Sequence, residues 1–156
     1  MSKSLKRVLR ALEDAQLQIT PLELGPETRT AQQAADAAGC ALDQIAKSVI
    51  FAGQTSGQAI LFITAGGNQV DPAKASALAG EALGRADADA VRAHTGFAIG
   101  GVSPVGHLNP VRSFMDPRLL EFGTIYAAAG TPRHIFPVEP ETLQRITGAQ
   151  VSVFTA

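Results

Sequence analysis

Apolar residues near the start of the chain recur at positions that share one face of a helix. Leu5, Val8, Leu9 and Leu12 follow this spacing, which predicts an amphipathic helix over residues 4–15. A β-type run follows at residues 18–24. We therefore expect the chain to begin with a helix that packs one apolar side on the core and then enters a strand.

Capping signals mark the later helices. Thr30 and Gln33 have the spacing of a capping box at the head of an alanine-rich segment, and Gly39 can close that helix. Asp71 followed by Pro72 supplies an N-cap and a proline at the first helical position. The further predicted helical segments are residues 72–78, 87–93, a turn begun at 116–117, and 140–147.

Two apolar runs in the middle of the chain predict a β-hairpin. Residues 46–52 and 58–64 are separated by five residues that begin and end with glycine, which suits an antiparallel pair. Further strands are predicted at residues 97–99, 111–115, 124–128, 134–136 and 151–154. Because strands and helices lack a regular βαβ alternation, we expect one α/β (α+β) domain over residues 1–156. Its sheet should be mixed, largely antiparallel and flanked by helices.

Composition limits the compartment and the chemistry. Cys40 is the only cysteine among 156 residues, which excludes an internal disulfide and fits a reducing compartment. No apolar run approaches the roughly 20 residues of a membrane helix, and the start lacks the apolar stretch of a secretory signal. We expect a cytoplasmic protein without a membrane partner.

The net charge of −1 excludes a basic field over the whole surface. We therefore expect no DNA partner, and any nucleic-acid contact should be local. Lys3, Arg7 and Arg10 share one face of the first helix. Positive charge at a helix N-terminus opposes the macrodipole, so this face is either a solvated surface or a contact for a partner.

The glycine-rich segment at residues 100–107 fails two familiar tests. A phosphate-binding loop needs Lys and then Ser or Thr where this chain has His107. A nucleophile elbow needs glycine two places after Ser103, where Val105 stands. The three histidines also lack the spacing of metal ligands, so we expect no metal and no cofactor.

Two features remain that carry chemistry. Lys47 lies in an apolar strand, on the same face as Val49 and Phe51. Gly100 and Gly101 let a ligand approach the backbone, and their N–H groups can point at an anionic oxygen. The alternatives are a structural salt bridge for the lysine and an ordinary tight turn for the glycines.

Residues 95–107 (TGFAIGGVSPVGH), preceded by 44–48 (QIAKS) and 70–74 (VDPAK), resemble the YbaK family. This family includes the editing domain inserted in bacterial prolyl-tRNA synthetases and the free-standing ProX-type trans-editing proteins. The resemblance extends over about residues 4–148 and includes 128–130 (AAG) and 140–143 (PETL). It implies a YbaK-like fold and hydrolysis, in trans, of the ester of a mischarged aminoacyl-tRNA, most often alanine or cysteine on the tRNA for proline.

The resemblance also implies roles for individual residues. The expected catalytic residues are Lys47, Gly100, Gly101 and Ser103, and the loop residues Pro104, Thr95 and His107 are expected to bind substrate. From the charge pattern of the first helix, Lys3, Arg7 and Arg10 are also expected to bind substrate. Where cysteine-editing members have an aspartate after the glycine turn, this chain has His134 and Ile135, which disfavours a cysteine-specific substrate.

An aminoacyl ester is already activated, so an editing site needs no strong nucleophile. In the expected mechanism, backbone N–H groups of Gly100 and Gly101 face the oxyanion, and Lys47 binds a terminal phosphate or the ester carbonyl. Ser103 or the ribose hydroxyl of the tRNA orients the water. The expected partners are the acceptor end of aminoacyl-tRNA and, further, prolyl-tRNA synthetase or an elongation factor. The alternatives are a non-catalytic aminoacyl-tRNA- or synthetase-binding module and a small-molecule binder or hydrolase.

Overall fold

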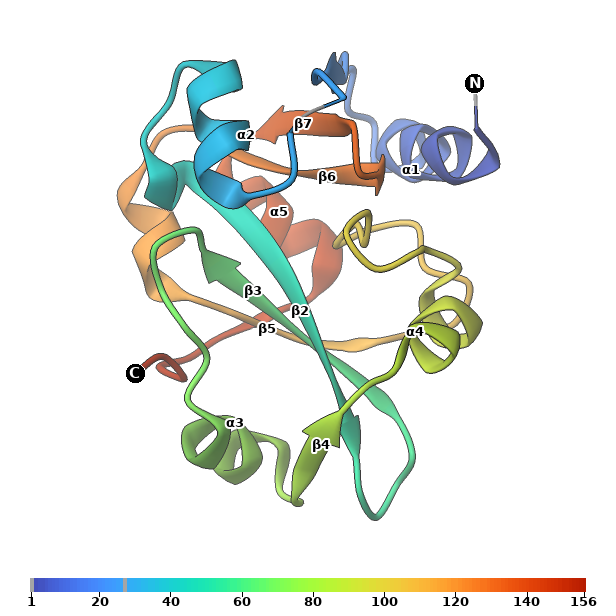
Figure 1. Cartoon of the computed structure of the whole chain (residues 1–156), viewed down its shortest axis with the longest axis vertical. Coiled ribbons are helices and arrows are strands. Elements are labelled where there is room, and N and C mark those ends of the chain that lie inside the picture. Colours follow the sequence, from blue (N-terminus) through green and yellow to red (C-terminus); the bar gives the residue numbers. More distant parts are fainter. Residues whose placement is uncertain (1, 27) are drawn as a thin grey trace.

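A mixed β-sheet extends through the molecule and carries helices on its faces (Figure 1). The computed structural model describes residues 2–26 and 28–156. The helices are α1 (Lys3–Asp14), α2 (Ala31–Ala38), α3 (Pro72–Ala79), α4 (Ala88–Thr95) and α5 (Pro140–Thr147), with 3-10 turns η1 (Leu42–Gln44) and η2 (Pro117–Glu121). The strands are β1 (Leu22–Glu23), β2 (Ile45–Gly53), β3 (Ala59–Ala65), β4 (Leu83–Arg85), β5 (Arg112–Met115), β6 (Ile125–Thr131), β7 (His134–Val138) and β8 (Gln150–Val151).

The strands follow the order β1-β7-β6-β2-β3-β5-β8, and β4 also pairs with β2. The pairs β1/β7, β6/β7, β2/β3 and β2/β4 are antiparallel. The pairs β2/β6, β3/β5 and β5/β8 are parallel. This confirms the mixed, largely antiparallel sheet expected from the sequence.

The central hairpin sets up an opening in the sheet. β2 pairs with β3 from Ala46 to Ala52, but it pairs with β6 only at Ile45 and Ala46. On the same edge of β2, the next strand pairing begins only at Phe51, which lies opposite Arg85 of β4. The middle of β2 is therefore open to contact from a loop.

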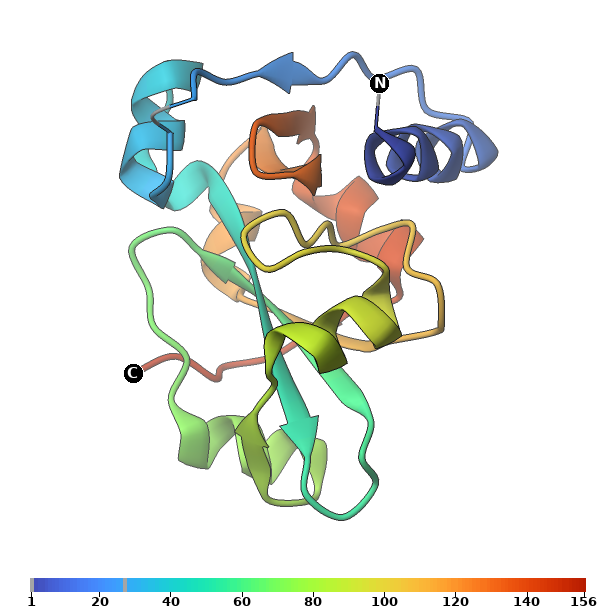
Figure 2. The same ribbon diagram turned by 45° about the vertical axis from the view of Figure 1, so that its right-hand side comes forward.

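The loop after α4 fills part of this region. Both views place it between α1 and α4 (Figures 1 and 2). Its buried residues Phe97, Val102 and Val105 join the main core with Leu5 and Val8 of α1. The loop is thus held by packing rather than by strand pairing.

Two smaller apolar clusters lie outside the main core. One packs α3 against aromatic residues, with the Phe62 and Phe114 rings stacked 5.2 Å apart. The other lies under α2 and joins Ala34 and Ala35 to Ile45 and Ile135. Successive residues of β3 face different clusters, which explains why every residue of this strand is buried.

The capping predictions are confirmed. Thr30 and Gln33 form the capping box of α2, and Gly39 closes that helix in a left-handed conformation. Asp71 caps α3 through its side chain, with Pro72 at the first position. The first helix also forms, with Ser2 as its N-cap.

Three strand predictions need correction. Residues 97–99 form no strand, because the chain turns at Ile99 and Gly100 and the Gly101 N–H bonds the Ala98 carbonyl at 3.0 Å. The strand expected at 18–24 is reduced to β1, and the one at 151–154 to β8, because few partner residues lie beside them. β4 was not predicted; its three residues are extended because β2 lies alongside.

No helix among residues 2–26 and 28–156 combines the length and apolar character needed to cross a membrane.

Candidate functional site

A cavity of about 460 Å³ lies where the open part of β2 meets the loop after α4 and the β6–β7 hairpin. The α2 end of the molecule closes another side, through residues that include Arg29, Ala31 and Ala34. Lys47 and Gly100 both line this cavity. The structure thus brings together two residues that the sequence analysis singled out independently.

Lys47 lies opposite Thr64 in the hairpin, and its Nζ donates a hydrogen bond to the Asn68 carbonyl at 2.7 Å. Among the described residues it makes no salt bridge. A lysine ammonium has three N–H donors, so two remain for a ligand. Burial lowers the pKa of Lys47, and the charges of Asp43 and Asp116 partly oppose this shift.

A buried carboxylate positions the carbonyl that Lys47 contacts. Asp116 accepts hydrogen bonds from the Ala65 N–H at 3.1 Å and from Asn68 Nδ2 at 2.9 Å. The preceding turn is fastened as well, because the Gly67 N–H donates to Asp43 Oδ1 at 2.8 Å. The turn therefore holds the Asn68 carbonyl in place for the ammonium.

The two adjacent glycines have different surroundings. Gly100 has φ +92° and open space where a Cβ would lie, and among the described residues its N–H donates no hydrogen bond. The Gly101 N–H is taken by Ala98, and a Cβ at Gly101 would lie 2.9 Å from the Thr131 backbone. The expected pair of oxyanion donors is therefore reduced to Gly100, while Gly101 permits close packing on the β6–β7 turn.

Ser103 and Thr95 lie away from the cavity. Ser103 is fully buried, and its Oγ accepts a hydrogen bond from the Val105 N–H at 3.2 Å. Thr95 is also fully buried; its Oγ1 donates to the Val91 carbonyl at 2.6 Å and accepts from the Phe97 N–H. Neither residue lines this cavity, so the roles expected for Ser103 and Thr95 stay predictions without support from its geometry.

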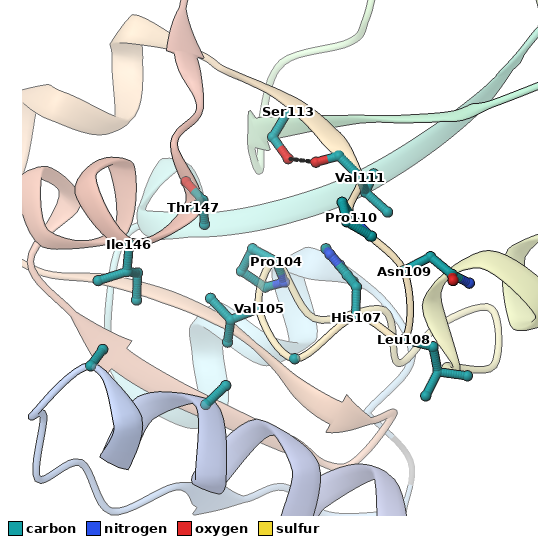
Figure 3. A pocket seen from close by; sticks show the side chains of 13 residues that line it. Pro104, Val105, His107, Leu108, Asn109, Pro110, Val111, Ser113, Ile146 and Thr147 are labelled. Carbon is teal, nitrogen blue, oxygen red and sulfur yellow. Dashed lines mark hydrogen bonds between the residues drawn. The ribbon is translucent and has the colours of Figure 1, made fainter. Parts of the chain in front are cut away.

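Pro104 and His107 line a different hollow, between the loop, the C-terminal half of α1 and the end of α5 (Figure 3). His107 Nε2 donates to the Ser103 carbonyl at 2.6 Å. Burial lowers the pKa of His107, the Ser103 hydrogen bond opposes this, and the Arg7 charge adds to it. Neither residue lines the Lys47 cavity, so their expected role in binding substrate stays a prediction, and the contact seen for His107 lies within the loop.

Arg7 makes structural contacts within the chain, and its expected substrate contact stays a prediction. Its Nε donates to the Gly106 carbonyl at 2.7 Å and its Nη2 to the Gly96 carbonyl at 2.9 Å. The guanidinium also lies 4.6 Å from the centroid of the Phe97 ring. Arg7 thereby ties both ends of the loop to α1.

Lys3 and Arg10 are exposed on α1. The helix itself adjoins the turn at one wall of the cavity, since a Cβ at Gly130 would lie 2.7 Å from the Ser4 carbonyl oxygen. These cations therefore belong to an element that contacts the site, although neither lines the cavity.

The sequence analysis missed several residues of the cavity wall. Ser48, Tyr126 and Thr131 line it, as does His134, whose Nδ1 lies 2.6 Å from Thr131 Oγ1. His134 was noted only as a departure from cysteine-editing relatives. No spacing in the sequence links these residues, because the fold alone brings β2 to the β6–β7 hairpin.

Among the residues that the structure describes, no group of three or more His, Cys, Asp or Glu side chains could hold a metal ion.

Comparisons with known proteins agree on one family. Residues 25–146 match the model of the aminoacyl-tRNA editing domain. The uncharacterized protein YwhH of Bacillus subtilis (strain 168) is 30% identical over 129 residues, which is 83% of this chain and 82% of YwhH.

Solved structures extend the comparison to the whole fold. A protein proposed to be a trans-editing enzyme for prolyl tRNA synthetase is 43% identical, with a TM-score of 0.94 over 100% of this chain and 99% of that one. The hypothetical protein APE2540 is 25% identical, with a TM-score of 0.87 over 96% and 99% of the two chains. These findings confirm the resemblance drawn from the sequence: the chain belongs to the YbaK-like aminoacyl-tRNA editing domain family.

Proposed function

We propose that this protein hydrolyses, in trans, the ester of a tRNA for proline that carries a wrong small amino acid, with alanine as the main substrate. The observation that carries the proposal is that Lys47 and the unbonded Gly100 N–H line one cavity. In a member of an editing family, this supports a site in which a cation and an amide donor act on the same ligand.

Hydrolysis of this ester does not require a strongly nucleophilic side chain. The ester is already activated, so a positioned water and a stabilised tetrahedral oxyanion are enough. Gly100 supplies an N–H for the oxyanion, and Lys47 binds the phosphate of the terminal nucleotide or the ester carbonyl. Since Ser103 lies elsewhere, the ribose hydroxyl of the tRNA is the better candidate to orient the water.

The cavity wall suits a small acyl group. Ala31, Ala34, Ala46 and Ala128 line it, and its volume of about 460 Å³ falls within the usual range for ligand pockets, roughly 300–1,000 Å³. A synthetase separates amino acids that differ by one methylene by only about 1–3 kcal/mol. A second, hydrolytic pocket that excludes the correct amino acid by size therefore supplies the missing discrimination.

Recognition of the tRNA is assigned to the acceptor end. Arg29 and Lys47 place positive charge in the cavity, and Lys3 and Arg10 extend it along α1. With a net charge of only −1, affinity for tRNA alone should be modest. Association with prolyl-tRNA synthetase or an elongation factor would raise the local concentration of substrate.

A deacylation panel tests the proposal. Purified protein is incubated with alanyl-, cysteinyl-, seryl- and threonyl-tRNAs, each on the tRNA body for proline and on a mismatched body. We expect fastest release of alanine from the tRNA for proline, with no change on addition of a chelator. Saturable binding without release from any tRNA would instead identify a non-catalytic binding module, and release from simple amino-acid esters without tRNA dependence would identify a small-molecule hydrolase.

A further inference from the structure

The tip of the loop after α4 presents a large apolar side chain at the open side of the cavity. Ile99 lines the cavity next to Gly100 and is 58% exposed. The other Leu, Ile and Val residues that line the cavity, within the described chain, are buried: Leu24, Ile45, Val102 and Ile135. A single exposed apolar residue is ordinary on a protein surface, so the position of Ile99 decides whether it has a role.

A tight turn fixes this position. The Gly101 N–H donates to the Ala98 carbonyl at 3.0 Å, which closes a four-residue turn with Ile99 and Gly100 at its centre. The φ of +92° at Gly100 matches the positive φ that type II turns require at their third residue. Both flanks are anchored, since Phe97 is fully buried and a Cβ at Gly101 would lie 2.9 Å from the backbone of β6. Ile99 is therefore held outward before any ligand binds.

The neighbouring N–H indicates which part of a ligand Ile99 would meet. In the proposed reaction the Gly100 N–H faces the oxyanion of the ester, and consecutive Cα atoms lie only about 3.8 Å apart. The small acyl group on one side of the ester suits the buried part of the wall, where Ala34 and Ala46 lie. On the other side of the ester is the ribose, which carries the adenine base toward the open side.

The chemistry of the two groups is complementary. The faces of an adenine ring are broad and apolar, and every base offers such a face for packing. An exposed Ile side chain gains free energy when it buries its surface against an apolar partner. The ribose and the phosphate are polar and gain nothing from this contact, so the base is the part of the terminal nucleotide that fits Ile99.

We propose that Ile99 packs against the adenine base of the terminal nucleotide and thereby positions the ester beside the Gly100 N–H. The inference rests on the proposed function, since it takes the ligand to be the aminoacyl end of a tRNA. It assigns to Ile99 affinity for the nucleoside and leaves the stabilisation of charge to Lys47 and Gly100.

Two non-hydrolysable ligands test this contact. The first is 3′-alanylamino-3′-deoxyadenosine, and the second is the matching methyl riboside, in which a methoxy group replaces the adenine. We expect the wild-type protein to bind the adenosine compound more tightly. Ile99→Ala should weaken that binding by about three- to tenfold, because most of the apolar contact with the base is lost. Binding of the riboside should be unchanged in the same variant, as measured by NMR titration.

Leu108→Ala is a matched control. Leu108 lies in the same loop and is also 58% exposed, but it lines the second hollow and not the Lys47 cavity. This variant should bind both ligands as the wild type does. Because both side chains are exposed, neither substitution should change the Tm by more than about 2 °C.

Further variants at Ile99 separate the apolar contact from other effects of substitution. Ile99→Met keeps a large apolar side chain and should keep the preference for the adenosine compound. Ile99→Asn replaces it with a polar side chain and should lose most of that preference. A preference kept in Ile99→Asn, or lost in Ile99→Met, would contradict the proposal.

The outcomes for Ile99 and for the proposed function remain distinct. A wild-type protein that binds both ligands equally, or neither, overturns the adenine contact. So does an unchanged affinity in Ile99→Ala, or an equal loss for both ligands. These measurements need no hydrolysis. Failure of every charged tRNA to be deacylated would therefore overturn the proposed activity, while a loss confined to the adenosine compound would still support the contact.

Discussion

Lys47 and Gly100 lie far apart in the sequence and meet because one strand and one loop share a cavity. Lys47 is held by the Asn68 carbonyl, which Asp116 positions in turn. Gly100 keeps a positive φ that other residues rarely adopt. At this scale, the proposed chemistry depends on two groups with free N–H donors, and each can be tested by substitution.

Substitution of Lys47 by alanine should lower kcat/KM for deacylation of alanyl-tRNA by about tenfold or more, because the cation that meets the ligand is lost. The measurement is release of labelled alanine under single-turnover conditions. Lys74→Ala is a matched control, since Lys74 also donates to a backbone carbonyl, that of Thr155 at 2.9 Å, but does not line the cavity. Normal turnover in Lys47→Ala would remove the proposed centre.

The lowered pKa of His107 predicts a pH dependence of stability. In the folded state the pKa of His107 lies below the ordinary histidine value of about 6.5, so the unfolded chain takes up a proton first as the pH falls. The stabilisation is complete above about pH 6.5 and is lost as the pH drops through the folded pKa. Urea unfolding of the wild type and of His107→Gln should show a smaller decline in the free energy of unfolding for the variant over this range. Identical declines would show that His107 is not the group responsible.

At the scale of elements, the loop after α4 is the least regular part of the site and depends on α1. Phe97, Val102 and Val105 bury their side chains in the main core, and Arg7 bonds a carbonyl at each end of the loop. Gly101 and Gly130 allow close approach at the neighbouring turns. The loop is therefore ordered by tertiary contacts, and its order depends most on the Arg7 guanidinium.

Arg7→Met should destabilise the protein by about 2–3 kcal/mol, because two carbonyls lose a charged donor. Chemical denaturation measures this change. Lys6→Met on the same helix is the control, since Lys6 is exposed and should alter the free energy of unfolding by less than about 0.5 kcal/mol. A variant that kept full stability but bound tRNA more weakly would restore the substrate-binding role first expected for Arg7.

Local chemistry explains which elements could be predicted from the sequence. Helix caps act within a few residues, so Thr30 with Gln33 and Asp71 with Pro72 marked α2 and α3 correctly. Strands depend on partners: residues 97–99 resemble a strand but have none, whereas β4 forms because β2 is beside it.

In the site, too, the sequence reveals residues with a local signal and misses those that depend on distant partners. Lys47 and Gly100 stood out as chemically unusual in their own segments. Ser48 and Thr131 did not, since their importance arises only from the way the sheet opens between β2 and β6. Ser103 and His107 do not join Lys47 and Gly100 at the cavity, because a short loop sends neighbouring side chains in different directions, here into the core and into a second hollow.

For the molecule as a whole, charge is local rather than general. The net charge is −1, yet the exposed face of α1 carries Lys3, Lys6 and Arg10. The helix α1 lies at the same end of the molecule as the β6–β7 hairpin, whereas β4 lies at the opposite end (Figure 1). An acceptor stem that enters the cavity past the hairpin would meet these cations.

Removal of Lys3 and Arg10 should therefore reduce the salt dependence of tRNA binding. Each lost phosphate contact should lower the slope of log K against log salt concentration by about 0.7 to 0.9. The double variant with glutamine at both positions is compared with Arg85→Gln, an exposed cation on β4. Equal slopes for all three proteins would exclude α1 from the tRNA contact.

The family match covers residues 25–146 and leaves out α1, although Arg7 on that helix secures the loop that lines the cavity. A domain trimmed to the shared region would lose the edge strands β1 and β8 as well as α1, and it would leave the carbonyls of Gly96 and Gly106 without their Arg7 donor. The smallest portable unit of this protein, for grafting or fusion, is therefore larger than its family core and must carry the first helix with it.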